Sequence, residues 1–342
     1  MANPRKTKKA QSSATAKLSA ALEFIFPAYK EKPQGAPYPS FCRMGNQQIV
    51  AFDGIVALGH PIDEDIAICP HLGRLNDAIK KAGETLNLTE LDSGRLSIKG
   101  DNLRVIVPCV DPVTIPAVMP DIQCGIVDNR IREGMAAVTG VIKEGDANTR
   151  WIETAALLRA NTIFATNGHL CFEFFHGIDL PPGLTLPKLA LTAVIKTGKA
   201  LTGFGFSPKT VTFYFEDGAW LKSQMFVEEY PNVDRLLSEH IGRLQPSDLP
   251  ECPAGLFEAI EAVKPHAEGA GVYLGPGVVK SHSQADVGAD YSVEGLSGYH
   301  VVNADYMKLI APHAQRLDLN HSETAAIFYG ERIRGVLMKM RG

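Results

Sequence analysis

One strand-and-turn pattern occurs twice in this sequence, at a distance that divides the chain into thirds. Ile163–Thr166 followed by Asn167-Gly168 repeats the pattern of Ile49–Phe52 followed by Asp53-Gly54. β-Branched and aromatic residues favour strands, and Asn-Gly and Asp-Gly favour tight turns. Asn167 lies 114 positions after Asp53, and 114 is one third of the 342 residues. The spacing therefore predicts tandem internal repeats.

Each turn is followed by a predicted helix. Apolar residues at helical spacing run from Leu72 to Ile79 and stop at Gly83, and a similar run from Leu191 to Ile195 stops at Gly198. Pro70 and Pro187 stand where a proline is tolerated in the first turn of a helix. Paired strands are expected next, at Arg95–Lys99 with Leu103–Val107 and at Thr210–Phe215 with Ala219–Lys222. Both copies then contain a proline step, Met119-Pro120-Asp121 and Tyr230-Pro231-Asn232.

A third copy is fainter but follows the same order. Asn303 is a good N-cap for a helix through Tyr306 and Ile310, and the strands Ala326–Tyr329 and Ile333–Met338 follow. Candidate opening helices of the three copies are Ala16–Phe26, Ile131–Ile142 and Leu256–Val263. The predicted fold class is α+β, with three tandem units of two helices packed on an antiparallel sheet. The predicted domains are residues 1–124 with a basic tail at 1–15, residues 125–247 and residues 248–342.

Composition and motifs exclude several classes of protein. The net charge is −4, the hydrophobic fraction is 45%, and the six cysteines form no C-x-x-C pair. No apolar run reaches the roughly 18 residues of a membrane span, and the N-terminus lacks the apolar core of a signal peptide. We therefore expect a cytoplasmic protein with reduced cysteines and no membrane contact.

No catalytic pattern is present in the sequence. H-E-x-x-H, G-x-S-x-G and P-loop motifs are missing, and the Gly-rich run Gly269–Gly275 leads into a strand, unlike a dinucleotide fingerprint. The histidines are spread along the chain without the spacing of a metal site. The sequence thus predicts no catalytic residues, no cofactor and no metal.

The arrangement resembles the bacterial DNA sliding clamp, the β subunit of DNA polymerase III. That protomer has three similar domains, and two protomers close head to tail around duplex DNA. Ala165–His169 is similar to the family's Ala-Thr-Asp-Gly-His turn, and Tyr230-Pro231-Asn232 to its Phe-Pro-Asp step. Val302–Tyr306 is similar to its Phe-Asn-x-x-Tyr helix start, and Leu337–Gly342 to its Val-Met-Pro-Met-Arg-Leu ending. The resemblance covers nearly the whole chain beyond the tail.

The sequence departs from the family pattern at several positions. Lys339 stands where the family usually has proline, Gly342 where it has leucine, and Leu170 where it often has arginine. The chain is also shorter than most cellular clamps. These departures indicate a divergent member, of phage or plasmid type, and leave the shape of its peptide pocket open.

The resemblance implies that helices facing the inside of a ring attract DNA phosphates without sequence preference. Lys188, Lys196 and Lys199 lie on one face of the second-copy helix, opposite Leu191 and Val194. The residues predicted to face DNA are Arg74, Lys80, Lys81, Arg132, Lys188, Lys196, Lys199, Lys264, Lys308 and Arg316. The third-copy helix is expected to carry Lys308 and Arg316. The alternative is that these cations belong to ordinary solvated helix faces.

The resemblance also implies a pocket that binds short apolar motifs of partner proteins. Carried over by position, its residues are Thr166, Gly168, His169, Leu170, Cys171, Met338, Met340 and Arg341. Methionine suits a site that accepts several partners, because its side chain is unbranched and polarizable. The alternatives are a core histidine at His169, satisfied by a backbone group, and simple core packing of Met338 and Met340.

The sequence therefore predicts a DNA sliding clamp, a processivity factor that forms a homodimeric ring on double-stranded DNA. Its partners would be a DNA polymerase and a clamp loader, which bind through short peptide motifs. A tether of this kind acts by raising the effective concentration of the polymerase at its template. Two alternatives stay open: a clamp-derived adaptor that does not encircle DNA, and an enzyme on a repeated α+β scaffold.

Overall fold

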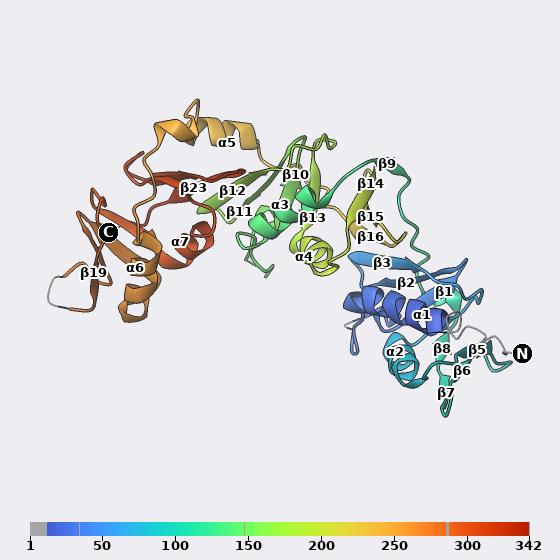
Figure 1. Ribbon diagram of the computed structural model, residues 1–342. Coiled ribbons are helices and arrows are strands. Elements are labelled where there is room, and N and C mark those ends of the chain that lie inside the picture. Colours follow the sequence, from blue (N-terminus) through green and yellow to red (C-terminus); the bar gives the residue numbers. More distant parts are fainter. Residues whose placement is uncertain (1–11, 34, 147, 285–286, 342) are drawn as a thin grey trace, which may run out of the picture. The chain divides into compact units, whose positions relative to one another are not determined.

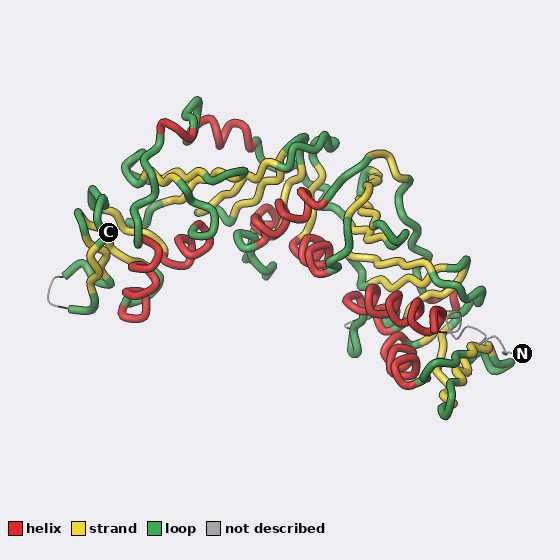
Figure 2. Tube along the Cα trace, viewed as in Figure 1, coloured by secondary structure: helices red, strands yellow, loops and turns green. Residues whose placement is uncertain are grey.

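The computed structural model describes residues 12–33, 35–146, 148–284 and 287–341. The chain forms two compact units, shown as ribbons in Figure 1 and by element type in Figure 2. Unit 1 comprises Met1–Asn129 and Ala193–Met225, and unit 2 comprises Arg130–Thr192 and Phe226–Gly342. Within the described residues, no helix combines the length and the apolar character needed to cross a membrane.

Unit 1 is built on a seven-stranded antiparallel sheet in the order β1-β2-β3-β16-β15-β14-β9. Its strands are β1 (Cys42–Gly45), β2 (Gln48–Phe52), β3 (Val56–Pro61), β9 (Gln123–Gly125), β14 (Leu201–Ser207), β15 (Thr210–Phe215) and β16 (Trp220–Gln224). The helices α1 (Ser12–Ile25) and α2 (Leu72–Lys81) lie together, with α1 on β2 and β3. Two small sheets complete the unit: β4 (Cys69–Pro70) with β8 (Cys109–Val110), and β5 (Asn87–Glu90), β6 (Leu96–Lys99) and β7 (Arg104–Val107).

Unit 2 has a second seven-stranded antiparallel sheet, in the order β13-β10-β11-β12-β23-β22-β21. Its strands are β10 (Ala155–Leu158), β11 (Thr162–Thr166), β12 (Leu170–Phe175), β13 (Leu184–Pro187), β21 (Arg316–Asp318), β22 (Ala325–Tyr329) and β23 (Ile333–Met338). A four-stranded antiparallel sheet, β19-β18-β17-β20, consists of β17 (Gly271–Gly275), β18 (Val278–Lys280), β19 (Asp290–Ser292) and β20 (His300–Asn303).

The remaining helices cover these sheets. They are α3 (Asn129–Thr139), α4 (Lys188–Lys196), α5 (Val233–His240), α6 (Leu256–Val263) and α7 (Ala304–Ile310). In unit 2, α5 lies on one side of the seven-stranded sheet and α3 on the other (Figure 1). Short 3-10 helices occupy Phe26–Ala28, Tyr38–Ser40, Pro112–Thr114, Trp151–Thr154, Pro246–Asp248 and Lys264–His266.

The spacing of 114 residues reappears in the register of the two large sheets. Ala57 pairs with Lys222 across β3 and β16, and Cys171 pairs with Val336 across β12 and β23, each 114 positions later. The pairs between β1 and β2 recur with the same shift between β10 and β11. The predicted α+β class with repeated antiparallel sheets is therefore confirmed.

Each large sheet takes strands from two of the predicted domains. β3 of predicted domain 1 pairs with β16 of predicted domain 2, and β12 of domain 2 pairs with β23 of domain 3. Ladders of this kind explain why the chain forms two compact units, although its sequence repeats three times. The boundaries at 124 and 247 stay a prediction. Most of the predicted basic tail, residues 1–11, lies outside the described residues.

The two prolines expected in first helical turns end strands instead. Pro70 pairs with Cys109 and Pro187 pairs with Ala155. The helices begin one or two residues later, and the side chain of His71 accepts a hydrogen bond from the backbone N–H of Arg74. Proline is compatible with the end of a strand as well as with the first turn of a helix, so the sequence pattern alone did not distinguish these two contexts.

A buried carboxylate joins three elements of unit 2. Glu173 on β12 is 2% exposed and accepts hydrogen bonds from Arg334 on β23 at 2.8 and 2.7 Å. Arg159 lies 3.4 Å from Glu173 and also pairs with Asp234 on α5 at 2.5 Å. This network fixes the pairing of β12 with β23 and the position of α5 over the sheet.

Replacement of Glu173 by alanine is expected to destabilise the fold, because Arg334 loses its carboxylate and Arg159 keeps only the exposed Asp234. The expected loss is about 2–3 kcal/mol, below the usual cost of breaking a fully buried pair because both arginines keep some contact with water. The matched control is Glu239→Ala, which removes an exposed pair with Arg235 and should cost less than about 1 kcal/mol. Urea denaturation measures both, and equal losses would contradict the buried network.

Candidate functional site

The repeated turn in unit 2 is held by one buried amide side chain. Asn167 is 4% exposed, and its Oδ1 accepts hydrogen bonds from the backbone N–H groups of His169 at 3.0 Å and Leu170 at 2.8 Å. Its own N–H donates to the carbonyl of Leu170 at 3.1 Å. Such side-chain bonds are typical of Asn in turns, and here they fix the direction in which His169 leaves the turn.

Thr166 and Gly168 complete this turn. The Thr166 hydroxyl donates to the carbonyl of Leu170 at 3.0 Å and accepts from the N–H of Gly168 at 3.1 Å. Gly168 has a φ of +86°, and a Cβ there would lie 2.7 Å from Nη2 of Arg150. Arg150 is itself paired with Glu153. Only glycine fits this position without displacing that ion pair.

His169 is exposed and contacts two other parts of unit 2. Its ring stacks on Tyr306 of α7, with centroids 6.3 Å apart and planes at 21°. Its carbonyl accepts a hydrogen bond from the N–H of Met338 at 2.7 Å. The alternative of a core histidine is therefore wrong, because the ring lies at the surface between the turn and the C-terminal strand.

Leu170 and Cys171 point to opposite faces of the sheet, as successive strand residues do. Cys171 pairs with Val336, and both belong to the apolar cluster under α5. Leu170 is 1% exposed and pairs with Leu337 on the other face. Burial raises the pKa of the Cys171 thiol to about 12, so it acts as a small apolar side chain. The structure thus places Cys171 in the cluster under α5 and turns Leu170 to the opposite face.

The apolar cluster lies between α5 and the outer face of the sheet. Its buried members are Leu157, Phe164, Cys171, Val233, Leu237, Ile241, Leu249, Ala325, Ile327, Tyr329 and Val336, and Tyr230, Leu236, Leu244 and Met338 pack against them partly buried. Sequence reasoning missed the contribution of α5 and β10. The available signal was the helical spacing of Val233, Leu236 and Leu237 directly after the Tyr230-Pro231-Asn232 step.

The C-terminal residues differ in their burial. Met338 packs against the apolar cluster, which agrees in part with the alternative of core packing. Met340 is 41% exposed, and its N–H donates to the carbonyl of Val301 on β20 at 2.8 Å. Arg341 is exposed. Of the predicted pocket residues, His169, Met340 and Arg341 are therefore at the surface, Met338 is partly buried, and Cys171 belongs to the buried cluster.

The exposed face of α2 in unit 1 is basic. Arg74, Lys80 and Lys81 are exposed, opposite the buried Leu75 and Ile79. Lys196 of α4 is exposed as well. None of these four cations has an acidic partner among the described residues. They are the predicted DNA-facing side chains most available to a phosphate backbone.

Other predicted DNA-facing lysines already have acidic neighbours. Lys188 pairs with Glu144 at 2.8 Å, Lys308 lies 3.7 Å from Glu261, and Lys264 pairs with Asp305. Exposed pairs of this kind contribute about 1 kcal/mol or less, so a phosphate can compete for the lysines.

Lys199 pairs with Asp217 and lies 3.0 Å from Nε2 of His60. Burial alone would raise the pKa of Asp217, but hydrogen bonds from Lys199 and the N–H of Ala219 lower it below its usual value. Asp217 therefore stays ionised at neutral pH and holds Lys199 against unit 1.

Two of the three arginines predicted to face DNA, Arg132 and Arg316, are less available than Arg74. Nε and Nη2 of Arg132 on α3 are buried without a hydrogen-bond partner in the described structure, and burial lowers the pKa of its guanidinium. The placement of Arg316 on the third-copy helix is wrong. That helix, α7, ends at Ile310, and Arg316 lies on β21 with Nη1 donating to the carbonyl of Leu249 at 2.7 Å. Pro312 follows the helix end and prevents its continuation.

Comparisons with known proteins identify the fold. No family model and no curated protein matches the sequence. Among solved structures, Caulobacter crescentus pol III beta matches with a TM-score of 0.77 and 17% identity, over 96% of this chain and 98% of the other. The DNA polymerase sliding clamp from Bacillus subtilis matches with a TM-score of 0.76 and 14% identity, over the same shares of both chains.

The chain therefore has the fold of bacterial DNA sliding clamps. Within that fold, the DNA polymerase III subunit beta from Pseudomonas aeruginosa is also similar, with a TM-score of 0.75 and 15% identity over 96% and 98% of the two chains. The Helicobacter pylori beta clamp bound to a DNA ligase peptide matches with a TM-score of 0.71 and 14% identity, over 96% and 99%.

Replacement of Asn167 by alanine is expected to destabilise unit 2 by about 2–3 kcal/mol, because two backbone N–H groups at the turn lose their acceptor. Asn167→Asp is the matched control, since its carboxylate keeps both acceptor positions, and it should stay within about 1 kcal/mol of the wild type. Chemical denaturation measures the loss, and the NMR shift of the His169 ring reports its displacement. Similar stabilities of the two variants would show that the side-chain bonds do not hold the turn.

Proposed function

We propose that this chain is a DNA sliding clamp, a processivity factor that encircles duplex DNA and tethers a replicative polymerase. The observation that carries the proposal is the clamp fold over 96% of the chain. The free cations Arg74, Lys80, Lys81 and Lys196 support it, because their helices place them away from the core. The protein would act by topology: phosphate attraction is independent of sequence, so the ring slides.

A ring would need two copies that join head to tail. The edge strands of the small sheets include β7 in unit 1 and β19 in unit 2. β7 exposes Arg104 and Ile106, and β19 exposes Asp290 and Tyr291. Opposite charges and exposed apolar side chains suit pairing of β7 of one copy with β19 of the other.

Light scattering tests closure of the ring: the mass of two 37.0 kDa chains is expected, and a monomer at high concentration would contradict a preformed ring.

The candidate pocket would bind polymerase and clamp loader through short apolar motifs. His169 and Tyr306 offer stacked rings at its surface, and Met338 offers a side chain that adapts to different partners. The Helicobacter pylori clamp is a precedent, since it binds a DNA ligase peptide. In this role the protein is a cytoplasmic accessory subunit without a catalytic site of its own.

The second candidate function is an adaptor that binds polymerase motifs without encircling DNA. It is favoured by the ion pairs of Lys188, Lys264 and Lys308, which reduce the positive charge available to phosphates. If the protein is such an adaptor, substitutions in the candidate pocket should impair its function, and substitutions of the helix cations should not. An enzyme on this scaffold is the third reading, and a stoichiometric metal or nucleotide in the purified protein would distinguish it.

Charge reversal of the free cations tests DNA binding. Lys80→Glu with Lys196→Glu is expected to weaken binding to a short duplex at least ten-fold. It should also reduce the salt dependence of binding, by about one unit of the log–log slope for each lost phosphate contact. The control, Lys32→Glu with Lys209→Glu, changes the net charge equally at exposed lysines outside the helices and should bind like the wild type. Equal affinity of the two double variants would favour the adaptor.

Truncation at the pocket tests partner binding. The probe is the DNA ligase peptide of the Helicobacter pylori complex, labelled for fluorescence anisotropy. His169→Ala is expected to weaken its binding at least ten-fold, because the ring is exposed and stacks on Tyr306. His266→Ala, at an exposed histidine elsewhere in unit 2, is the control. If both variants bind the peptide like the wild type, the pocket does not lie at His169.

A further inference from the structure

The four-stranded sheet of unit 2 has one face without a covering helix. Val272, Val279 and Val302 are buried on the face that packs α6 and α7. The opposite face carries Tyr273, which pairs with Lys280 of β18 on one side and with Val301 of β20 on the other. These three side chains are only half-buried, since alternate strand residues point away from the helices.

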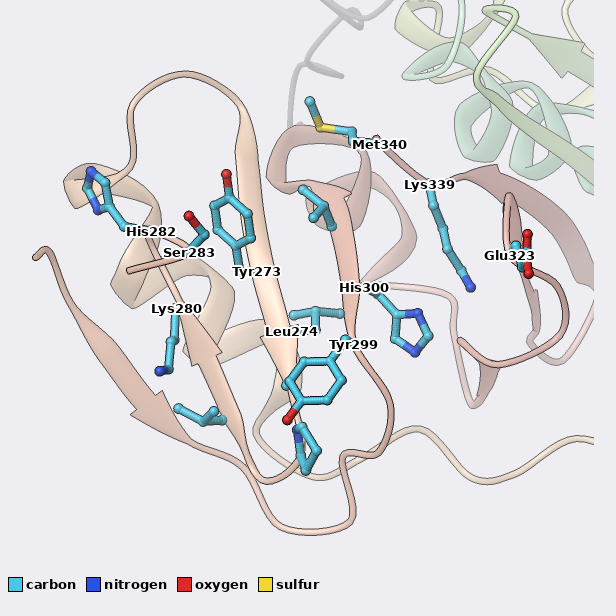
Figure 3. Close-up of a pocket in the computed structure, with 14 residues that line it drawn as sticks. Tyr273, Leu274, Lys280, His282, Ser283, Tyr299, His300, Glu323, Lys339 and Met340 are labelled. Atoms are coloured by element: carbon cyan, nitrogen blue, oxygen red, sulfur yellow. The ribbon is translucent and has the colours of Figure 1, made fainter. Parts of the chain in front are cut away.

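A cavity of about 520 Å³ lies on this outer face (Figure 3). Its lining includes Tyr273, Val278, Tyr299 and Met340. Tyr299 is 84% exposed, although a tyrosine ring has a large apolar surface. Two aromatic rings and a methionine around one hollow are the usual composition of a binding surface and not of an ordinary solvated face.

The rim of the cavity carries two lysines, Lys280 and Lys339, and the histidines His282 and His300. Burial lowers the pKa of His300, and Glu323 is the one acidic residue of the lining among the described residues. Lys280 has no ion-pair partner among the described residues, although Asp290 stands opposite to it on β19. The rim therefore complements an acidic ligand.

The C-terminal segment runs from the turn at His169 to the edge of the cavity. The N–H of Met338 bonds to the carbonyl of His169, and two residues later the N–H of Met340 bonds to the carbonyl of Val301. The Met340 side chain then lies over Gly271 at the edge of the cavity. An extended chain advances about 3.3 Å per residue, so a few residues beyond a motif bound at His169 would reach the cavity.

Lys339 makes this surface particular to the present chain. Its backbone N–H donates to the carbonyl of Thr324 at 2.8 Å, a bond that proline at this position could not form. Its Nζ donates to the carbonyl of Ser322 at 2.5 Å, which holds the cation beside the cavity. Burial lowers the pKa of Lys339, and a bound carboxylate would offset that cost.

We propose that this cavity binds an acidic, aromatic-containing segment of a partner protein that continues from the motif held at His169. The inference rests on the proposed function of that pocket. The acidic side chains of the segment pair with Lys280 and Lys339, and its aromatic ring packs between Tyr273 and Tyr299. Single-stranded nucleic acid also stacks on aromatic rings. Glu323 disfavours it, because a phosphate chain cannot avoid that carboxylate, whereas a peptide can place its acids at the lysines alone.

The probes are the peptides acetyl-Glu-Glu-Phe-Glu-Glu-amide and acetyl-Gln-Gln-Phe-Gln-Gln-amide, titrated by NMR into the full chain. The acidic peptide is expected to shift the resonances of Tyr273 and Tyr299, and the glutamine peptide to bind at least ten-fold more weakly. Lys280→Glu and Tyr299→Ala should each weaken the acidic peptide at least ten-fold. Both positions are at the surface, and thermal denaturation confirms that the variants fold. Lys209→Glu, an exposed lysine of unit 1, is the control.

Two results would overturn the inference. One is equal affinity of the acidic peptide for the wild type and for Lys280→Glu. The other is tighter binding of an oligo-dT hexamer than of the peptide at the same resonances, which would assign the cavity to nucleic acid.

The ligase peptide separates this inference from the proposed function. If it binds in a His169-dependent way while the acidic peptide does not bind, the motif pocket stands and the cavity proposal fails. The reverse pattern rejects the motif pocket and leaves an independent acidic-peptide site.

Discussion

The antiparallel ladder between β12 and β23 is the contact on which the candidate pocket depends. Its paired residues are 159 to 167 positions apart in the sequence, and its register places Cys171 opposite Val336 and Glu173 opposite Arg334. A slip of one residue would turn every side chain to the other face. The apolar cluster under α5 and the bond between His169 and Met338 would then both be lost. The buried pairing of Glu173 with Arg334 opposes such a slip, because any other register would leave these charges without partners.

The corresponding ladder in unit 1 joins β3 and β16, but different contacts cover the sheet face that α5 covers in unit 2. Ala57 and Lys222 stand where unit 2 has Cys171 and Val336. Lys222 pairs with Asp121 at 2.9 Å, and Asp121 also accepts hydrogen bonds from the hydroxyls of Thr210 and Thr212. In unit 1, the ion pair and hydrogen bonds of Asp121 thus hold the segment after Pro120 on the sheet. In unit 2, the apolar side chains of α5 cover the corresponding sheet face. An apolar cluster covered by a helix accordingly forms on one of two sheets with the same register.

Two groups of lysines and arginines can be distinguished, those paired with acidic residues and those exposed on helices. Cations near the sheets are held by acids, as Lys222 is by Asp121 and Lys199 by Asp217, and they stabilise the fold. The cations of α2 are exposed on a helix whose other face is core, and they are the ones available to a ligand. A chain with a net charge of −4 can therefore have locally basic surfaces, because burial and pairing decide which charges act at a distance.

The sequence by itself determined the repeat, the strand-and-turn pattern and the fold class, because these depend on local propensity and on spacing that any sheet of this kind must keep. The spacing from Asp53 to Asn167 became the shift between two sheet registers. Sequence also predicted His169 and the cations of α2 as site residues, and the structure places these side chains at the surface. Only the tertiary structure separated Cys171 from Leu170, since facing depends on the pairing of β12 with a distant strand. It also brought α5 over the sheet. These features arise from contacts between segments far apart in the chain, and no local pattern encodes them.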